Sequence, residues 1–254
     1  MKIAVITGAS SGMGREFVYA LDRQQKFDEI WVIARRAERL EALRPRLRAG
    51  LRVMTLDLQQ RESILQYRQA LQQAQPDVAV LVNAAGFGVF GAFREMPLED
   101  VMNMIDLNAR ALAAMTHATL PYMKGGSQIY NLGSMSSFQP VPYMTVYGAS
   151  KAFVLSFSCA MNVELKKQGI HVMAVCPGWI KTEFFDRAVR DDTVSYYNRY
   201  YTAKQVVDQA LEDMAKGKDV SVLGTPERRQ VFLVKHLPHK MVMDTWCRQQ
   251  KLDH

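Results

Sequence analysis

Short apolar runs alternate along this chain with longer segments in which apolar residues recur at helical spacing. Seven runs have the length of a strand: 2–7, 30–34, 52–56, 78–82, 128–132, 171–175 and 220–223. Six helical patterns lie between them: 13–25, 37–48, 61–73, 98–123, 146–167 and 202–216. Because the early strands are continuously apolar rather than alternating, they predict a parallel sheet buried on both faces. The fold class is therefore α/β, a doubly wound parallel sheet with helices on both faces.

The alternation continues without a Pro/Gly/Ser linker or an internal repeat, which predicts a single domain over residues 1–254. Residues 225–254 form a C-terminal extension with an apolar side among basic residues. We expect this extension to pack on the domain or on a partner subunit; contact with a membrane surface is the less favoured interpretation.

Composition narrows the function without deciding it. The net charge is +7, but the basic residues are scattered along the chain. The simplest interpretation is a solvated basic surface, and the more specific one is a binding site for an anionic cofactor. No Lys/Arg stripe with interleaved aromatics indicates nucleic-acid binding. The N-terminus has the pattern of a strand rather than a signal peptide, and no apolar run is long enough to predict a membrane span.

Three cysteines, Cys159, Cys176 and Cys247, lie far apart without a C-x-x-C pair, which favours free thiols in a reducing cytoplasm. His236, His239 and Cys247 do not match a usual metal-site spacing, so we expect no metal.

The turn after the first strand allows two interpretations. Gly8 to Gly12 spell G-A-S-S-G, the nucleophile elbow of a serine hydrolase with Ser10 as the attacking residue. The same turn, extended to Gly14, is a glycine-rich loop that could hold phosphates at a helix N-terminus. The hydrolase also needs a downstream acid and histidine at strand ends, and no histidine of the sequence has that setting. The phosphate loop is therefore favoured.

A second group of residues points to proton transfer. Tyr147 and Lys151 are four residues apart in a helical pattern and share one face. An ammonium near a phenol favours phenolate, so we expect Lys151 to lower the pKa of Tyr147 and make it an acid–base group. Ser134 follows the strand 128–132 and is expected at the same edge of the sheet.

These residues, taken in order, identify the chain as similar to the classical short-chain dehydrogenases/reductases, which have a Rossmann fold. The matching motifs are T-G-A-S-S-G-M-G at Thr7–Gly14, Asp57, N-A-A-G at Asn83–Gly86, Asn108, Ser134, Y-G-A-S-K at Tyr147–Lys151 and P-G-W-I-K-T at Pro177–Thr182. Ala84 departs from the family, which usually has a second asparagine there.

The resemblance implies an enzyme that interconverts a ketone and a secondary alcohol. Tyr147 would be the general acid or base, Lys151 would lower its pKa and bind the nicotinamide ribose, Ser134 would orient the substrate oxygen, and Asn108 would hold a relay water. The cofactor-binding residues implied are Gly8, Ser10, Ser11, Gly12, Met13, Gly14, Arg35, Arg36, Asp57, Leu58, Asn83, Ala84, Gly86, Tyr147, Lys151, Pro177, Gly178, Ile180 and Thr182. A non-catalytic NADP-binding sensor on the same fold is disfavoured, because Ser134, Tyr147 and Lys151 are all present.

The end of the second strand indicates which cofactor. An acid there binds the ribose 2′-hydroxyl of NAD, whereas an arginine accommodates the 2′-phosphate of NADP. This strand ends in Arg35 and Arg36 without an acid, and Arg15 adds a third cation, so the sequence predicts NADP(H).

Aromatic residues follow several strands and predict a small hydrophobic carbonyl or alcohol substrate, such as a hydroxysteroid, a 3-oxoacyl compound or an aromatic or aliphatic ketone. The substrate residues predicted from them are Phe87, Phe138, Tyr143, Trp179 and Phe184. We expect a homodimer or homotetramer; the sequence leaves the choice open.

Overall fold

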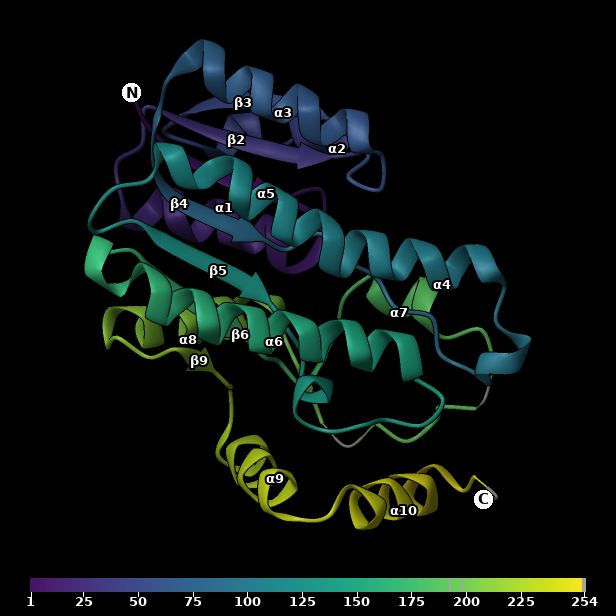
Figure 1. The fold of residues 1–254 in the computed structure, drawn as a ribbon. Coiled ribbons are helices and arrows are strands. Elements are labelled where there is room, and N and C mark those ends of the chain that lie inside the picture. Colours follow the sequence, from purple (N-terminus) through teal and green to yellow (C-terminus); the bar gives the residue numbers. More distant parts are fainter. Residues whose placement is uncertain (192, 198, 253–254) are drawn as a thin grey trace.

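A seven-stranded parallel sheet forms the centre of the protein (Figure 1). A computed structural model describes residues 1–191, 193–197 and 199–252. The strands run in the order β3-β2-β1-β4-β5-β6-β9, and every neighbouring pair is parallel. Their bounds are β1 Lys2–Thr7, β2 Glu29–Ala34, β3 Gly50–Thr55, β4 Asp77–Asn83, β5 Gln128–Leu132, β6 His171–Val175 and β9 Val220–Ser221. The predicted doubly wound sheet is confirmed.

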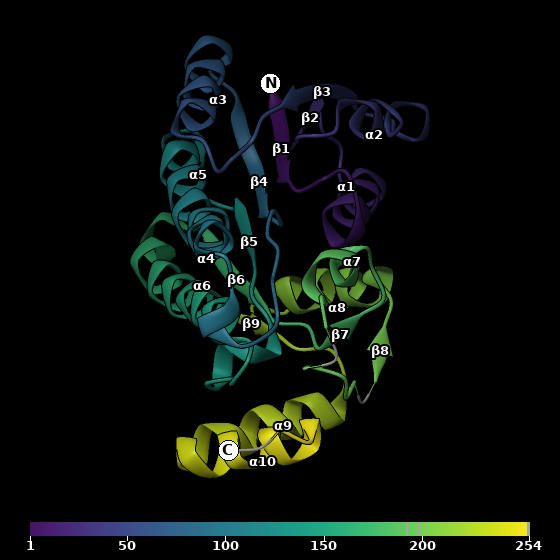
Figure 2. The same ribbon diagram turned by 90° about the vertical axis from the view of Figure 1, so that its right-hand side faces the viewer.

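Helices cover both faces of this sheet, as Figure 2 shows nearly edge-on. One face carries α1 (Gly12–Gln24) and α8 (Ala203–Ala215). The other carries α3 (Arg61–Ala74), α4 (Leu98–Ile105), α5 (Leu112–Thr119) and α6 (Thr145–Leu165). The strand order reverses between β1 and β4, so the carboxyl ends of these strands form the crevice in which such sheets bind ligands.

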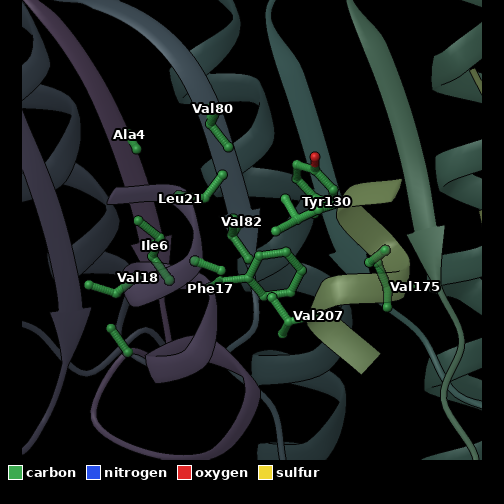
Figure 3. Close-up of a cluster of buried hydrophobic side chains, with 14 of the residues drawn as sticks. Ala4, Ile6, Phe17, Val18, Leu21, Val80, Val82, Tyr130, Val175 and Val207 are labelled. Atoms are coloured by element: carbon green, nitrogen blue, oxygen red, sulfur yellow. The ribbon is translucent and has the colours of Figure 1, made fainter. Parts of the chain in front are cut away.

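Two buried apolar clusters lie against the two faces of the sheet, and β1, β2, β4, β5 and β6 each contribute buried residues to both. In β1, Ala4 and Ile6 belong to one cluster and Ile3 and Val5 to the other. Figure 3 shows the first cluster, where the Phe17 ring of α1 lies 5.2 Å from the Tyr130 ring of β5, centroid to centroid. Burial on both faces explains why the early strands are continuously apolar.

Two predicted helices are interrupted. The segment 37–48 is helical only as α2 (Ala37–Glu41), followed by a 3₁₀ turn at Arg44–Arg46. Pro45 has no N–H to donate to the Glu41 carbonyl, so the α-helix does not continue beyond Glu41. The segment 98–123 contains a π-helical stretch at Asp106–Ala111 between α4 and α5. This wide turn leaves no mark in the sequence pattern, which predicts one continuous helix here.

Residues after β6 form elements that the sequence analysis did not predict. A two-stranded parallel sheet joins β7 (Trp179–Ile180) to β8 (Tyr200–Tyr201), and α7 (Phe184–Ala188) lies between them. Two residues per strand and five in the helix are too few to give a periodic pattern.

The C-terminal extension forms two helices, α9 (Thr225–His236) and α10 (His239–Gln250), beyond the carboxyl edge of the sheet (Figure 2). The Trp246 indole N–H donates to the Pro142 carbonyl over 3.0 Å. The Gln250 amide oxygen accepts from the backbone N–H groups of Ser195 and Tyr196. The extension therefore contacts the loop before α6 and the segment before β8. Among the described residues, every helix is too short or too polar to cross a lipid bilayer.

Candidate active site

The loop between β1 and α1 is shaped for close approach of its backbone to a ligand. Gly8 and Gly12 have φ angles of 66° and 53°, which favour glycine. A Cβ atom on Gly8 would lie 2.8 Å from the Ala84 backbone. At the N-terminus of α1, the Ser11 side chain caps no backbone N–H group, and the first turn has no acid. Free N–H groups and a positive helix end fit a phosphate.

The two serines of this loop are engaged by an arginine. One Arg36 nitrogen donates to the hydroxyl oxygens of Ser10, at 3.1 Å, and Ser11, at 3.2 Å. A guanidinium stays protonated and does not act as the base that a serine nucleophile requires. The local geometry therefore gives no support to a hydrolytic Ser10.

A cavity of about 1170 Å³ extends from this loop along the carboxyl edge of the sheet. Most of the predicted cofactor residues line it: Gly8, Ser10, Ser11, Gly12, Met13, Gly14, Arg35, Arg36, Asp57, Leu58, Ala84, Gly86, Tyr147, Lys151, Pro177, Gly178, Ile180 and Thr182. Ser134 lines it as well. The structure thus gathers residues from seven separate segments around one space.

Asn83 lies behind the cavity rather than in its lining. Its side-chain amide nitrogen donates to the Asn131 side-chain oxygen at 2.8 Å and to the Thr116 hydroxyl at 3.0 Å, within the buried core. These bonds tie the ends of β4, β5 and α5 together. We interpret the Asn83 side chain as a support for the strand ends.

Asn108 also lies just outside the lining. Its side-chain oxygen accepts from the Phe87 N–H at 3.0 Å, and its nitrogen donates to the Phe87 carbonyl at 2.8 Å and the Ser150 hydroxyl at 3.0 Å. The π-helical turn carries Asn108, and such turns occur often at functional sites. Protein groups occupy both of its polar atoms, so the structure gives this side chain a bracing role; the relay water stays a prediction.

Tyr147, Lys151 and Ser134 meet at the end of β5. The Tyr147 hydroxyl is hydrogen-bonded to Ser134. The Lys151 ammonium donates to the Leu132 carbonyl over 2.7 Å and lies 5.7 Å from the centre of the Tyr147 ring. Tyr147 and Lys151 are both at least nine-tenths buried. A Cβ atom on Gly86 would lie 3.3 Å from the Lys151 nitrogen, so glycine leaves room for the ammonium.

Comparison with protein families agrees with this arrangement. The short chain dehydrogenase family model matches residues 2–193, which is most of the chain. The chain belongs to the short-chain dehydrogenase family.

Individual relatives of this short-chain dehydrogenase differ in substrate. Sulfoacetaldehyde reductase 2 of Chromohalobacter salexigens is 37% identical over 191 residues, covering 72% of this chain and 74% of that protein. A short-chain dehydrogenase from Sphingobium yanoikuyae, solved with NADPH, is 29% identical, with a TM-score of 0.79 over 94% of this chain and 97% of its own. The bulky-bulky ketone specific alcohol dehydrogenase of Comamonas testosteroni is 25% identical, with a TM-score of 0.73 over 94% and 95% of the two chains.

Burial controls the proton affinities at this dehydrogenase's site. It raises the pKa of the Tyr147 phenol to about 12, although the hydrogen bond from Ser134 opposes the rise. It lowers the pKa of the Lys151 ammonium to about 8. In the protein alone the net pKa of Tyr147 is therefore raised, and a lowering by Lys151 stays a prediction. The ammonium is directed to the Leu132 carbonyl, and loss of hydration dominates both groups.

Aromatic side chains form a wall beside Tyr147. The Phe184 ring lies 5.5 Å and the Phe90 ring 5.9 Å from the Tyr147 ring, between centroids. Phe87, Phe90, Trp179, Phe184 and Phe185 line the cavity. Of the predicted substrate residues, Phe87, Trp179 and Phe184 are thus brought together.

Phe138 and Tyr143 are not among the residues that line the cavity. The Phe138 ring packs against the cluster around Cys176 and Val222, with the Lys235 ammonium 5.0 Å from its centre. Tyr143 packs against the buried cluster that includes Met104 and Val141. Both residues lie between Ser134 and Tyr147 in the chain, but neither is part of the cavity lining.

Two further residues lie near the site and were not predicted from the sequence. The Ser150 hydroxyl accepts from Asn108 and donates to the Tyr147 carbonyl at 2.7 Å, linking the π-helical turn to α6. Glu183 lines the cavity and pairs with Arg36 and Arg39. Glu183 follows directly on the P-G-W-I-K-T motif, which was the only signal in the sequence.

Replacing Lys151 by Met should stabilise the fold at pH 7. The unfolded chain keeps the Lys151 proton up to about pH 10.5, but the folded protein only up to about pH 8. Below pH 8 the native fold therefore bears the full cost of the buried charge, and its stability rises with pH between these two values. We expect Lys151→Met to raise the free energy of unfolding at pH 7 by about 1–3 kcal/mol.

Urea unfolding at pH 7 and at pH 9.5 measures this difference. The advantage of the variant should shrink at the higher pH, where less of the native Lys151 is charged. A less stable variant at pH 7, or an equal difference at both pH values, would contradict the assignment.

Proposed function

We propose that this protein is an NADP(H)-dependent oxidoreductase that interconverts a ketone and a secondary alcohol on a hydrophobic substrate. The meeting of Tyr147, Lys151 and Ser134 beside an aromatic wall, in the same cavity as the glycine-rich loop, carries this proposal. The glycine-rich loop and the acid–base group line the same cavity, as a reaction between cofactor and substrate requires.

The proton chemistry follows from the buried groups. When bound, a nicotinamide cofactor supplies or accepts the hydride. In reduction, the Tyr147 phenol donates its proton to the carbonyl oxygen as that oxygen gains negative charge. Ser134 donates a hydrogen bond to the same oxygen and orients it. Lys151 is protonated at pH 7 because its pKa is about 8, and its positive charge favours the resulting phenolate.

Cations at the end of β2 support the phosphorylated cofactor. Arg35 and Arg36 follow Ala34, the last residue of β2, and both line the cavity next to the glycine-rich loop. Arg36 already bonds the hydroxyls of Ser10 and Ser11, which together form an anion-binding corner. Guanidinium groups and hydroxyls suit a 2′-phosphate. The relative from Sphingobium yanoikuyae was solved with NADPH.

Single replacements of Arg35 and Arg36 by Ala should weaken NADP⁺ binding about tenfold or more and leave NAD⁺ binding within about twofold, because only NADP⁺ carries the 2′-phosphate. Titration calorimetry measures both affinities. Arg68→Ala, which removes an exposed charge on α3, is the matched control and should bind both cofactors as the native protein does. Equal losses for both cofactors would argue against 2′-phosphate recognition.

The size and lining of the cavity favour a bulky apolar substrate. Eight of the described aromatic residues line it, and so do Leu233, Leu237 and Val242 of the C-terminal extension. An alcohol dehydrogenase specific for bulky-bulky ketones is among the similar structures, whereas a similar sequence is a sulfoacetaldehyde reductase. The aromatic wall supports the former substrate class over a small anionic aldehyde.

Tyr147→Phe should lower turnover about 10³-fold while NADPH binding stays nearly unchanged, because only the proton donor is lost. Loss of NADPH absorbance with bulky aromatic ketones, hydroxysteroids and sulfoacetaldehyde as substrates measures both turnover and substrate class. Tyr143→Phe removes a nearby hydroxyl outside the cavity lining and should stay active. Undiminished turnover by Tyr147→Phe would refute the proposed acid–base role.

We further propose that the protein is a cytoplasmic homodimer. The free cysteines suit a reducing compartment. Helices α4 and α6 lie side by side (Figures 1 and 2) and expose apolar side chains at helical spacing: Leu98, Met102 and Ile105 on α4, and Phe153 and Val163 on α6. Pairing of this surface with a second copy would cover it.

Phe153→Glu should convert the dimer to a monomer, because a charge would enter the apolar contact. Light scattering after gel filtration gives the mass. Leu65→Glu introduces the same charge at an exposed leucine of α3, outside this surface, and should leave the mass unchanged. A native protein that is already monomeric, or a Phe153→Glu variant of unchanged mass, would contradict the proposed interface.

A further inference from the structure

Glu183 reaches across the cofactor cleft to the arginines at the far side. It lies between β7 and α7, whereas Arg36 and Arg39 lie after β2, nearly 150 residues earlier in the chain. Its carboxylate oxygens are 2.6 and 2.8 Å from one Arg39 nitrogen. The oxygen at 2.6 Å, Oε2, also accepts from an Arg36 nitrogen at 3.2 Å. The two cations hold the pKa of Glu183 below its usual value.

The same Arg36 guanidinium faces the glycine-rich loop. Through its other terminal nitrogen it bonds the hydroxyls of Ser10 and Ser11. Ser10, Ser11, Arg36 and Glu183 all line the cavity. One guanidinium thus joins the proposed 2′-phosphate corner to a carboxylate from the opposite wall.

The segment carrying Glu183 also borders both halves of the site. Thr182 packs toward the glycine-rich loop, since a Cβ atom on Gly12 would lie 3.5 Å from its methyl group. On the other side of Glu183, the Phe184 ring lies against Tyr147. The neighbours of Glu183 in the chain therefore contact both the glycine-rich loop and the aromatic wall.

We propose that Glu183 is an internal competitor for the cofactor's 2′-phosphate. In the free protein its carboxylate pairs with Arg36, one of the two arginines proposed to receive the phosphate, and like-charge repulsion prevents both anions from sharing Arg36 in this arrangement. A 2′-phosphate must displace it, so Glu183 reduces the affinity for the phosphorylated cofactor and sets the degree of cofactor preference. This inference rests on the proposed NADP(H) function.

Solvent exposure of these ion pairs limits how strongly Glu183 can weaken phosphate binding. The side chains of Arg36, Arg39 and Glu183 are each between four and five tenths exposed, so each ion pair is only moderately strong. Two such pairs would weaken phosphate binding by a measurable but small factor. Glu183 therefore tunes the preference rather than reversing it.

Binding of 2′,5′-ADP and 5′-AMP tests the inference without turnover. The first nucleotide carries the 2′-phosphate and the second lacks it, and neither carries nicotinamide. Glu183→Gln should bind 2′,5′-ADP about threefold to fivefold more tightly than the native protein, with 5′-AMP affinity changed less than about twofold. Titration calorimetry at constant salt gives both values.

A matched control separates local competition from net charge. Glu41→Gln removes an exposed carboxylate that pairs with Arg44, outside the cavity lining, and should leave both affinities unchanged. Hydrogen exchange of peptides covering residues 179–186 provides a second readout. Glu183→Gln should speed their exchange in the free protein, because the segment loses its anchor to Arg39.

The outcomes distinguish the two proposals. If the native protein prefers 2′,5′-ADP but Glu183→Gln binds it equally or more weakly, the competitor inference is wrong and the NADP(H) proposal stands. An equal gain in Glu41→Gln would also overturn it, because net charge would then be the cause. If the native protein binds both nucleotides equally, the NADP(H) preference fails and the inference fails with it.

Discussion

The hydrogen bond from the Lys151 ammonium to the Leu132 carbonyl is the contact on which the site depends. It joins α6 to the end of β5 at the carboxyl edge of the sheet. Because Tyr147 lies one helical turn before Lys151, this bond also places the phenol next to Ser134. A buried ammonium needs such a partner, since loss of hydration without compensation is costly. The position of Tyr147 is therefore set by satisfying the charge of its neighbour.

The surrounding residues make this buried charge possible. Gly86 leaves space beside the ammonium, and Asn108 holds the adjacent Phe87 backbone through both of its polar atoms. Ser150 connects Asn108 to the backbone of Tyr147. The wide π-helical turn thus serves a bracing network behind the reacting groups. Burial raises the pKa of the phenol and lowers the pKa of the ammonium, so that both groups favour their neutral forms.

The charged groups at the other end of the cavity are more exposed to solvent. Arg36, Arg39 and Glu183 are partly exposed, so their interactions are individually weak and adjustable. Tyr147 and Lys151 are buried, whereas the end of the cavity with Arg36 is held by partly exposed ion pairs. This division suits a site in which the proton donor stays fixed while a charged cofactor enters and leaves.

The amino-acid sequence by itself determined the sheet, because double-sided burial leaves continuous apolar runs at β1, β2 and β4. It also determined the candidate site residues at strand ends, since parallel strands bring their carboxyl ends to one edge. Local breaks such as the π-helical turn and the short β7–β8 pair could not be predicted, as neither produces a periodic pattern.

Only the tertiary structure decided which side chains face the cavity and how burial sets their charges. It leaves Phe138, Tyr143 and Asn83 out of the lining and directs Lys151 to a backbone carbonyl, and burial raises the pKa of Tyr147. It also brought Glu183 to Arg36 and Arg39. Such contacts join segments far apart in the chain, and spacing along the sequence carries no information about them.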